Sequence, residues 1–276
     1  MSLKTSLEAF VKGTPFLDNR MGYVFEMGTY LKYLVRPKQT PSTKFIIFGT
    51  GRSGSTLLVS LIDSNTHIFC DNEIYHRKVM FPRAYREALA RIANKEVYGF
   101  KLLMYHISLK LGIKNENFGD YLQSLVDDGY KIIHLRRHNI VRQALSNVYA
   151  RHRGQFHSNS TVGKKTDKKM VVNLSELERW IRDIEEQAHW EVELLESIPH
   201  LSLGYEVDLE DQRAHGRTLK RVSQFLGVNV EPPDTELKKV TPKSLESFVE
   251  NHEEVMAFLR LHGWAHYIEN EALPQV

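Results

Sequence analysis

The stretch of residues 44–64 restricts the possible folds of this chain more than any other part of it. It reads KFIIFGTGRSGSTLLVSLIDS. A short run of β-branched and aromatic residues leads into a turn with three glycines, and an apolar pattern of helical length follows. This order predicts a buried strand, a tight turn and a helix. A strand that leads directly into a helix is the typical beginning of a parallel sheet covered by helices.

The rest of the chain repeats this alternation. We expect strands at 44–50, 67–70, 97–103, 131–136 and 201–206. We expect helices at 55–64, 76–93, 115–128, 139–153 and 174–197, and two more that end at Gly227 and Gly263. The pattern predicts an α/β fold with a central parallel sheet flanked by helices. We expect one domain over 1–276, with an N-terminal extension at 1–43 and a helical C-terminal segment at 234–276.

Composition excludes several classes of protein. The chain is 42% hydrophobic and 26% charged, as in ordinary globular proteins. Its net charge of +3 gives no reason to expect a nucleic-acid partner, and it has no apolar run long enough for a transmembrane helix. The single cysteine, Cys70, fits a reducing compartment, so we expect a cytoplasmic protein without integral membrane association. Its histidines do not show the spacing of metal ligands, and we expect no metal.

Positive charge is concentrated in one part of the chain. Residues 131–169 contain ten lysines and arginines and one acid, Asp167. Such a block is either a solvated face or a surface that attracts a polyanionic ligand. Residues 154–172, which overlap the end of this block, are polar and basic and have no hydrophobic periodicity. We expect them to form a mobile loop that closes over a ligand as a lid.

The glycine-rich turn has the spacing of a phosphate-binding loop. Gly49 and Gly54 enclose four residues, and Thr56 stands where that motif requires a threonine or serine, but Ser55 replaces its lysine. Backbone N–H groups at the start of a helix still favour an anion there. Without the lysine, and without a clear acidic metal ligand at a strand end, NTP hydrolysis is disfavoured. Because 49–56 and 136–139 both follow strands, we expect them to share one site at the carboxyl edge of the sheet.

Five segments together resemble sulfotransferases that use 3′-phosphoadenosine 5′-phosphosulfate (PAPS). The resemblance is greatest to the bacterial carbohydrate, Nod-factor and tyrosylprotein branches, and it covers residues 44–209 in order. It implies a P-loop-type three-layer fold and transfer of a sulfuryl group to a hydroxyl, with 3′-phosphoadenosine 5′-phosphate (PAP) as product. The segments are RSGSTL at 52–57, CDNE at 70–73, GFK at 99–101, IIHLRRHNIVRQALS at 132–146 and LGYEVDL at 203–209.

The resemblance also implies roles for individual residues. Glu73 is expected to be the general base, with a pKa raised by a partly desolvated site, and Lys101 to neutralise charge on the leaving oxygen. His106 is a weaker candidate for the base. Arg137, or its neighbour Arg136, is expected to bind the 3′-phosphate together with Ser146, and Tyr205 to lie near the adenine. The loop that holds the 5′-phosphosulfate consists of Gly51, Arg52, Ser53, Gly54, Ser55 and Thr56.

The sequence leaves the acceptor and two other functions open. The bacterial branch that 132–146 resembles favours a glycan or glycolipid acceptor. A P-loop kinase with a relocated lysine is one alternative, and it would consume ATP with Mg²⁺. The other is a nucleotide- or polyanion-binding module without turnover, against which the presence of both Glu73 and Lys101 argues.

Overall fold

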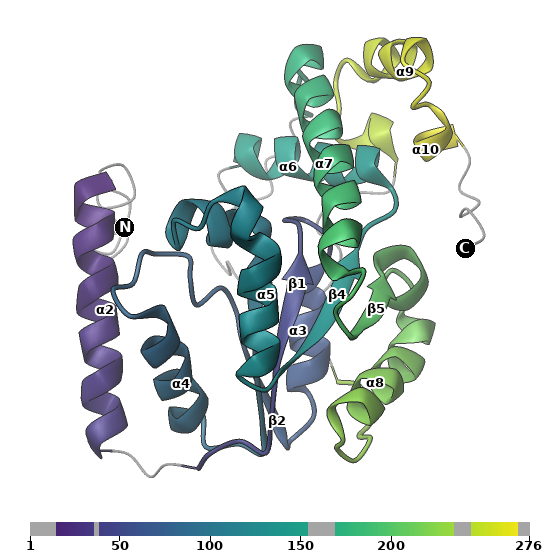
Figure 1. Ribbon diagram of the computed structural model, residues 1–276. Coiled ribbons are helices and arrows are strands. Elements are labelled where there is room, and N and C mark those ends of the chain that lie inside the picture. Colours follow the sequence, from purple (N-terminus) through teal and green to yellow (C-terminus); the bar gives the residue numbers. More distant parts are fainter. Residues whose placement is uncertain (1–14, 36–38, 154–168, 235–243, 270–276) are drawn as a thin grey trace.

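Five parallel strands form the centre of the computed structural model, which describes residues 15–35, 39–153, 169–234 and 244–269 (Figure 1). Within these residues the strand order is β2-β3-β1-β4-β5. The predicted parallel sheet is confirmed, and each predicted strand lies in it with ends shifted by at most two residues. The strands are β1 Thr43–Gly49, β2 Ile68–Asp71, β3 Val97–Leu103, β4 Tyr130–Arg136 and β5 His200–Gly204.

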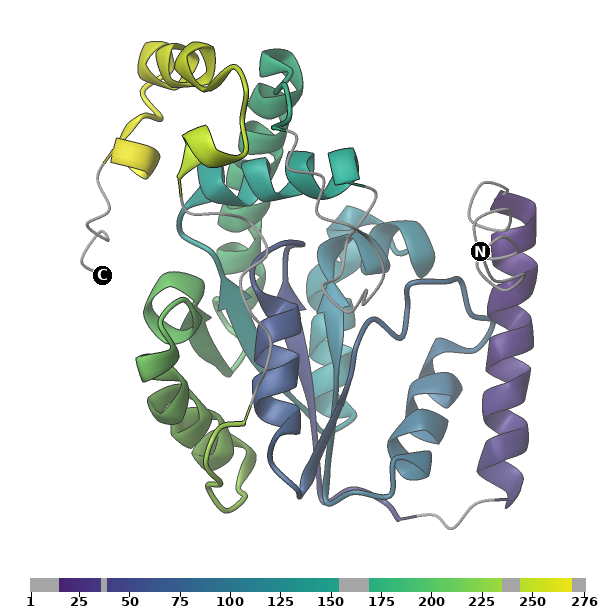
Figure 2. The same cartoon turned by 180° about the vertical axis from the view of Figure 1, so that it is seen from behind.

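Helices cover both faces of the sheet because successive strand residues point to opposite sides. Phe45 and Ile47 of β1 pack with α3 (Ser55–Asp63) and α8 (Gln212–Leu226). Ile46 and Phe48 point to the other face, which is covered by α4 (Pro82–Ile92), α5 (Phe118–Asp127) and the end of α7 (Leu174–Leu195). Figure 1 shows α5 in front of the sheet, and Figure 2 shows α3 in front in the opposite view. The result is the expected three-layer α/β arrangement.

A second apolar cluster lies beyond the carboxyl ends of the strands. It joins α6 (Ile140–Arg153) and the first half of α7 to α9 (His252–Leu261), α10 (His266–Glu269) and the short helix η4 (Leu245–Ser247). The two predicted C-terminal glycines follow α8 and α9, with φ of 83° at Gly227 and 76° at Gly263. Among the described helices, none combines the length and the apolar character needed to cross a bilayer.

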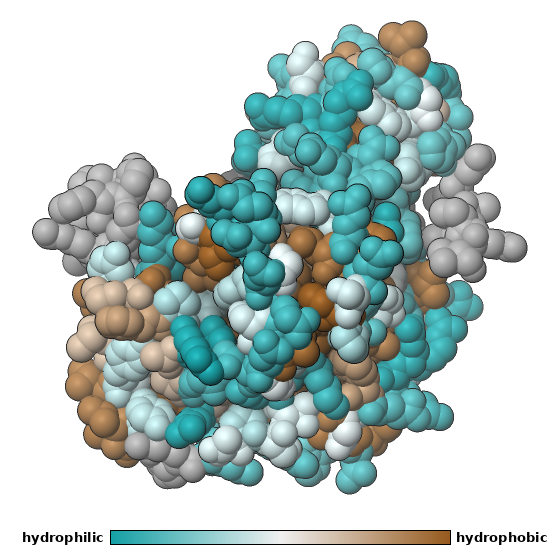
Figure 3. All heavy atoms as spheres, viewed as in Figure 1, coloured by the Kyte–Doolittle hydropathy of each residue, from teal (hydrophilic) through white to brown (hydrophobic). Residues whose placement is uncertain are grey.

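The chain before β1 forms a long helix, α2 (Pro15–Val35), that packs against α4. Buried Glu26 of α2 accepts hydrogen bonds from the backbone N–H groups of Met80 and Phe81, at 2.6 and 2.8 Å. The helix expected at 76–93 therefore begins only at Pro82, because the preceding N–H groups bond to Glu26 instead. Helix α2 exposes the side chains of Val24, Leu31 and Leu34. Figure 3 shows hydrophobic, brown atoms at the left edge of the molecule, where Figure 1 places this helix.

Two further boundaries differ from the sequence-based expectation. The strand expected at 201–206 ends at Gly204, and Tyr205–Leu209 form a π-helical turn, η3. Buried Asp208 explains this end, since its carboxylate accepts a hydrogen bond from the Gly204 N–H at 2.8 Å. Most of the predicted lid, residues 154–168, lies outside the described residues.

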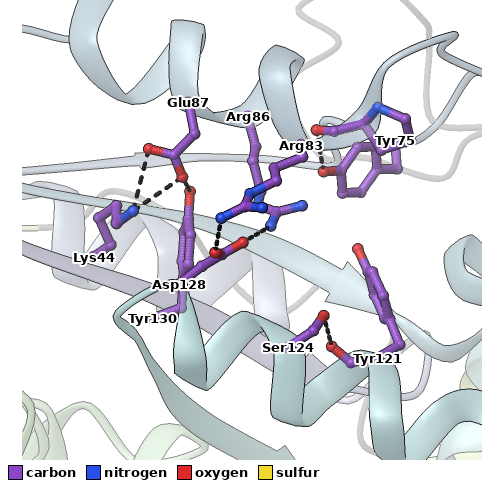
Figure 4. Close-up of polar contacts among 10 residues, drawn as sticks. Lys44, Tyr75, Arg83, Arg86, Glu87, Tyr121, Ser124, Asp128 and Tyr130 are labelled. Carbon is purple, nitrogen blue, oxygen red and sulfur yellow. Dashed lines mark hydrogen bonds and ion pairs between the residues drawn. The ribbon is translucent and has the colours of Figure 1, made fainter.

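A cluster of polar contacts joins α4 to the end of α5 and to the sheet, on the side opposite the predicted site (Figure 4). Asp128, just after α5, forms ion pairs with Arg83 and with buried Arg86 of α4. Lys44 of β1 pairs with Glu87 of α4 at 2.9 Å, and the Tyr130 hydroxyl donates to the same carboxylate at 3.1 Å. The guanidinium of Arg86 needs Asp128, because a buried charge without a counter-ion is unfavourable.

Replacing Asp128 should therefore destabilise the protein strongly. We expect Asp128→Ala to lower the free energy of unfolding by about 3–5 kcal/mol, the usual effect of leaving a buried charge unpaired. Exposed Asp127→Ala, one residue earlier, removes only a surface hydrogen bond with Gln123 and should cost less than about 1 kcal/mol. Urea denaturation of both variants measures the difference. Equal losses would show that the Arg86 ion pair is not important for stability.

Candidate functional site

The glycine-rich loop joins β1 to α3 with an unusual backbone. Arg52 has a φ of 64° and Gly54 a φ of 95°. A Cβ atom on Gly54 would lie 2.4 Å from a ring carbon of Tyr205, so only glycine fits this close approach. The Ser53 hydroxyl donates to the carbonyl of Thr50 at 3.0 Å inside the loop. Helix α3 then begins at Ser55, and the first N–H groups of a helix lack partners within it. The loop thus has the form of an anion-binding site.

The second predicted motif lies directly against this loop. Nε and Nη2 of Arg52 donate to the hydroxyl oxygen of Ser146 in α6 at 3.2 and 3.1 Å. The side-chain amide of Gln143, also in α6, donates to Thr50 Oγ1 at 2.9 Å and to the carbonyl of Gly51 at 2.7 Å. The loops after β1 and β4 therefore meet, as expected for two neighbouring parallel strands.

Arg137, rather than Arg136, is the arginine beside the loop. Its Nη1 donates to the carbonyl of Arg52 at 3.4 Å, and its guanidinium lies 4.5 Å from the ring centre of Tyr205. Only 8% of Arg137 is exposed, and its buried Nε has no hydrogen-bond partner in the described structure. Glu206 is its nearest acid, with 3.8 Å between Nε and Oε1. Arg136 instead acts electrostatically on Glu191 and Tyr267.

The positive side chains of Arg52 and Arg137 thus share a partly buried region. Burial and the charge of neighbouring Arg137 lower the pKa of the Arg52 guanidinium, whereas Glu73 acts in the opposite direction. The Glu206 carboxylate is also bonded to the backbone N–H groups of His138 and Asn139, both at 3.0 Å. Repulsion between Arg52 and Arg137 would be relieved by an anion that binds between them.

A second cluster surrounds Glu73, which follows β2. Its Oε1 lies 3.1 Å from the ammonium group of Lys101 in β3, and Lys101 also donates to the hydroxyl of Thr56 in the loop at 3.2 Å. Its Oε2 accepts a hydrogen bond from the Tyr105 hydroxyl at 2.5 Å and lies 3.3 Å from Nε2 of His106. The structure therefore brings Glu73, Lys101 and His106 together and connects them to the loop through Thr56.

The hydrogen bonds of His106 do not fit the role of a base. Its Nδ1 accepts from the backbone N–H of Leu103 at 3.0 Å, so the ring proton is on Nε2 and is donated to Glu73. Burial lowers the pKa of His106, although Glu73 acts in the opposite direction, and the lowered pKa favours this neutral form. A ring that donates through one nitrogen and accepts through the other has no lone pair left for a proton from a substrate. This contact places His106 where it can orient Glu73.

The expected rise in the pKa of Glu73 is wrong. Burial alone raises this pKa, but the hydrogen bond from His106, the charge of Lys101 and the hydrogen bond from Tyr105 together hold it well below its ordinary value. Desolvation alone would raise this pKa, and the sequence does not show the three donors that outweigh it. Glu73 is therefore a stable carboxylate in this arrangement.

Sequence reasoning also missed Tyr105, Gln143 and Glu206. Gln143 lies within the segment 132–146, three residues before Ser146 and hence on the same face of α6, which is a signal that could have identified it. Glu206 follows Tyr205 within LGYEVDL and could have been examined for the same reason. Tyr105 had no such signal, because its contact with Glu73 depends on the turn that follows β3.

Known sequences and known structures differ in what they share with this chain. No protein-family model matches the sequence, and a search of curated proteins finds no match. Among solved structures, the chain is similar to a sulfotransferase from Alicyclobacillus acidocaldarius, with 15% sequence identity and a TM-score of 0.46. The similarity covers 84% of this chain and 97% of that one.

The low pKa of Glu73 predicts how the protein responds to acid. The pKa of the carboxyl is lower in the folded than in the unfolded chain, so its stabilising effect is complete above the unfolded value of about 4.3 and is lost as the pH falls towards the folded value. Glu73→Gln lacks this effect. We expect the free energy of unfolding of this variant at pH 7 to be lower than that of the wild type by up to about 3 kcal/mol. This difference between variant and wild type should become smaller below about pH 4.

Urea denaturation at several pH values between 7 and 3 measures this gap. Exposed Glu246→Gln is the control, and its stability should follow that of the wild type at each pH. A gap that stays constant down to pH 3, or widens, would contradict the electrostatic account of Glu73.

Proposed function

We propose that this protein is a sulfotransferase that moves the sulfuryl group of PAPS to an acceptor hydroxyl. The observation that carries the proposal is the junction of the two predicted nucleotide motifs. Arg52 of the loop after β1 bonds to Ser146 of the helix after β4, and Glu73 and Lys101 adjoin the same loop through Thr56. An anion-binding loop, a second arginine and a carboxylate–ammonium pair at one edge of a sheet are the groups that such a transfer needs.

The residues present fit a ligand with anionic groups at two positions. The loop amides and Arg52 would hold the 5′-phosphosulfate, and Arg137 and Ser146 the 3′-phosphate. The buried Nε of Arg137, which has no hydrogen-bond partner among the described residues, is a donor available for such a group. Because Arg52 bonds to Ser146, the two groups of residues adjoin each other, and ligand binding would exchange this bond for bonds to the ligand.

The catalytic pair would act on the acceptor and on the leaving oxygen. PAPS supplies an activated sulfuryl group. Glu73 would take the proton of the acceptor hydroxyl as that oxygen bonds to sulfur, and Lys101 would stabilise the negative charge left on PAP. Lys101 already lies at the loop, 3.2 Å from Thr56 Oγ1, so it needs little movement to do so. No step of this scheme requires a metal.

The proposed acceptor is a glycan or glycolipid, because the segment 132–146 resembles the bacterial carbohydrate branch. The proposed location is the cytoplasm, which fits the single cysteine. We do not propose a nucleic-acid partner or integral membrane association.

One contact favours a second candidate function. The bond between Lys101 and Thr56 brings a lysine to a phosphate-binding loop from another strand, as a P-loop kinase with a relocated lysine would require. Calorimetry with PAP and with ATP–Mg²⁺ discriminates between the two functions. Tighter binding of PAP supports the sulfotransferase, whereas a preference for ATP–Mg²⁺ supports the kinase.

The same calorimetry tests Arg52. We expect Arg52→Ala to weaken PAP binding by about 1–3 kcal/mol, the usual effect of losing charge-assisted hydrogen bonds. Exposed Arg83→Ala, at the far end of the sheet, is the matched control and should bind PAP as the wild type does. Unchanged affinity of the Arg52 variant would remove this residue from the site.

Turnover tests Glu73. Among chains that remain folded by circular dichroism, Glu73→Gln should bind PAP but form PAP from PAPS about 10²–10⁴ times more slowly, the usual effect of removing a general base. His106→Ala removes only the group that orients Glu73, so its rate of PAP formation should fall less than that of Glu73→Gln. A greater loss in the His106 variant would transfer the role of base to the histidine.

A further inference from the structure

Three hydrogen-bond donors surround the carboxylate of Glu73, and they differ in exposure. Lys101 is 1% exposed and His106 0%, whereas Tyr105 is 39% exposed. All three reach Glu73 from β3 or from the turn that follows it. The donor that a molecule from solvent can reach most easily is therefore the hydroxyl of Tyr105.

The two buried donors are also held by other contacts. Lys101 bonds to Thr56 Oγ1, and His106 accepts the backbone N–H of Leu103. Movement of either side chain would leave a buried polar group unpaired, which is unfavourable. Tyr105 can swing outward without this cost, because water can solvate its hydroxyl. Such a movement would also change its ring contact with His106, at 4.3 Å between centroids.

The Tyr105 hydroxyl is phenolic, but it contacts Glu73 in the way that a substrate hydroxyl would. It donates to Glu73 Oε2 at 2.5 Å, as an acceptor must do before it gives up its proton. The second neighbour of Oε2 is His106, so both lone-pair positions of that oxygen are taken. A further hydroxyl can bond to Oε2 only when one of these donors leaves.

We propose that Tyr105 guards the catalytic carboxylate: its hydroxyl occupies the position at Oε2 in which the acceptor hydroxyl binds, and the acceptor displaces it while Lys101 stays paired with Oε1. This inference rests on the proposed sulfotransferase function. Tyr105 is tethered beside Glu73, so a single water molecule competes poorly with it, whereas an acceptor brings binding energy from the rest of its structure. The guard thus limits loss of the sulfuryl group to water while no acceptor is bound.

Displacement would also change the reactivity of Glu73. Each donor to a carboxylate lowers its pKa, so the departure of Tyr105 raises the pKa of Glu73 towards its ordinary value. The carboxylate then becomes a stronger base at the moment when the acceptor hydroxyl arrives. The charged and titratable groups near it are Lys101 from β3, His106 from the following turn and Arg52 from the loop. His76, whose ring bonds to the backbone carbonyl of Glu73 and acts electrostatically on His106, is a fourth.

The test is the release of sulfate from PAPS with water as the acceptor, so no acceptor needs to be known. Tyr105→Phe keeps the ring and removes the hydroxyl. We expect it to raise sulfate release about 3- to 10-fold, a range that the loss of one hydrogen bond permits. Tyr23→Phe is the matched control, because Tyr23 is 38% exposed and lies on α2, and its rate should equal that of the wild type. The double variant Glu73→Gln with Tyr105→Phe should show no rise over Glu73→Gln alone.

The pH profile of sulfate release gives a second readout, which a purely structural role of Tyr105 would not change. The acid limb should move to higher pH in Tyr105→Phe and stay in place in Tyr23→Phe, because only the former removes a donor from the ionised carboxylate. Unchanged or slower sulfate release by Tyr105→Phe, or no release by any variant, would overturn the proposal that Tyr105 guards Glu73. Slower release with normal PAP binding would instead indicate that Tyr105 passes the proton to Glu73. Failure of the wild type to bind PAP would contradict the proposed function itself.

Discussion

The buried ammonium group of Lys101 is the interaction on which the site depends. It lies in β3, between β2 and β1 in the sheet, where an unpaired charge would be strongly unfavourable. Its partners are Glu73, which follows β2, and Thr56, at the start of the helix that follows β1. One charge therefore fixes the relative positions of three successive segments. The buried ammonium group needs both partners, and its contacts with them hold the carboxylate beside the glycine-rich loop.

The site contains a positively charged region beside a region in which the charges compensate one another. Arg52 and Arg137 lie on the side of β4 and α6, where the largest excess of positive charge in the sequence begins. The Glu73 cluster lies on the side of β2 and β3, and Lys101 compensates its carboxylate. An anionic ligand would be attracted to the first region and would meet little net charge in the second. In the proposed function, such an arrangement would separate the binding of the nucleotide from the transfer of the proton.

The sequence predicted the sheet well because its strands are short apolar runs separated by helical patterns. It also predicted that the loops after β1 and β4 meet, since this follows from parallel topology alone. The start of α4 and the end of β5 could not be predicted in the same way. They are set by Glu26 and Asp208, two buried carboxylates that bond to backbone N–H groups of the same or a distant segment. The prediction of a raised pKa for Glu73 was wrong for a related reason. This pKa depends on contacts with three side chains, and the sequence pattern does not give their positions. The roles of the site residues remain predictions.

The close approach of Gly54 and Tyr205 has a consequence for the synthesis of the protein. The loop belongs to the first strand of the sheet, yet the ring against which it packs is added about 150 residues later. Gln143 and Ser146, which bond to the same loop, also come after β4. A chain emerging from the ribosome can form β1 and α3 early, but contacts of such sequence separation form late. The glycine-rich loop is therefore expected to acquire its final shape only when β5 and η3 have joined the fold. A truncated product that ends before Tyr205 would contain the whole glycine motif and still lack the ring against which it packs.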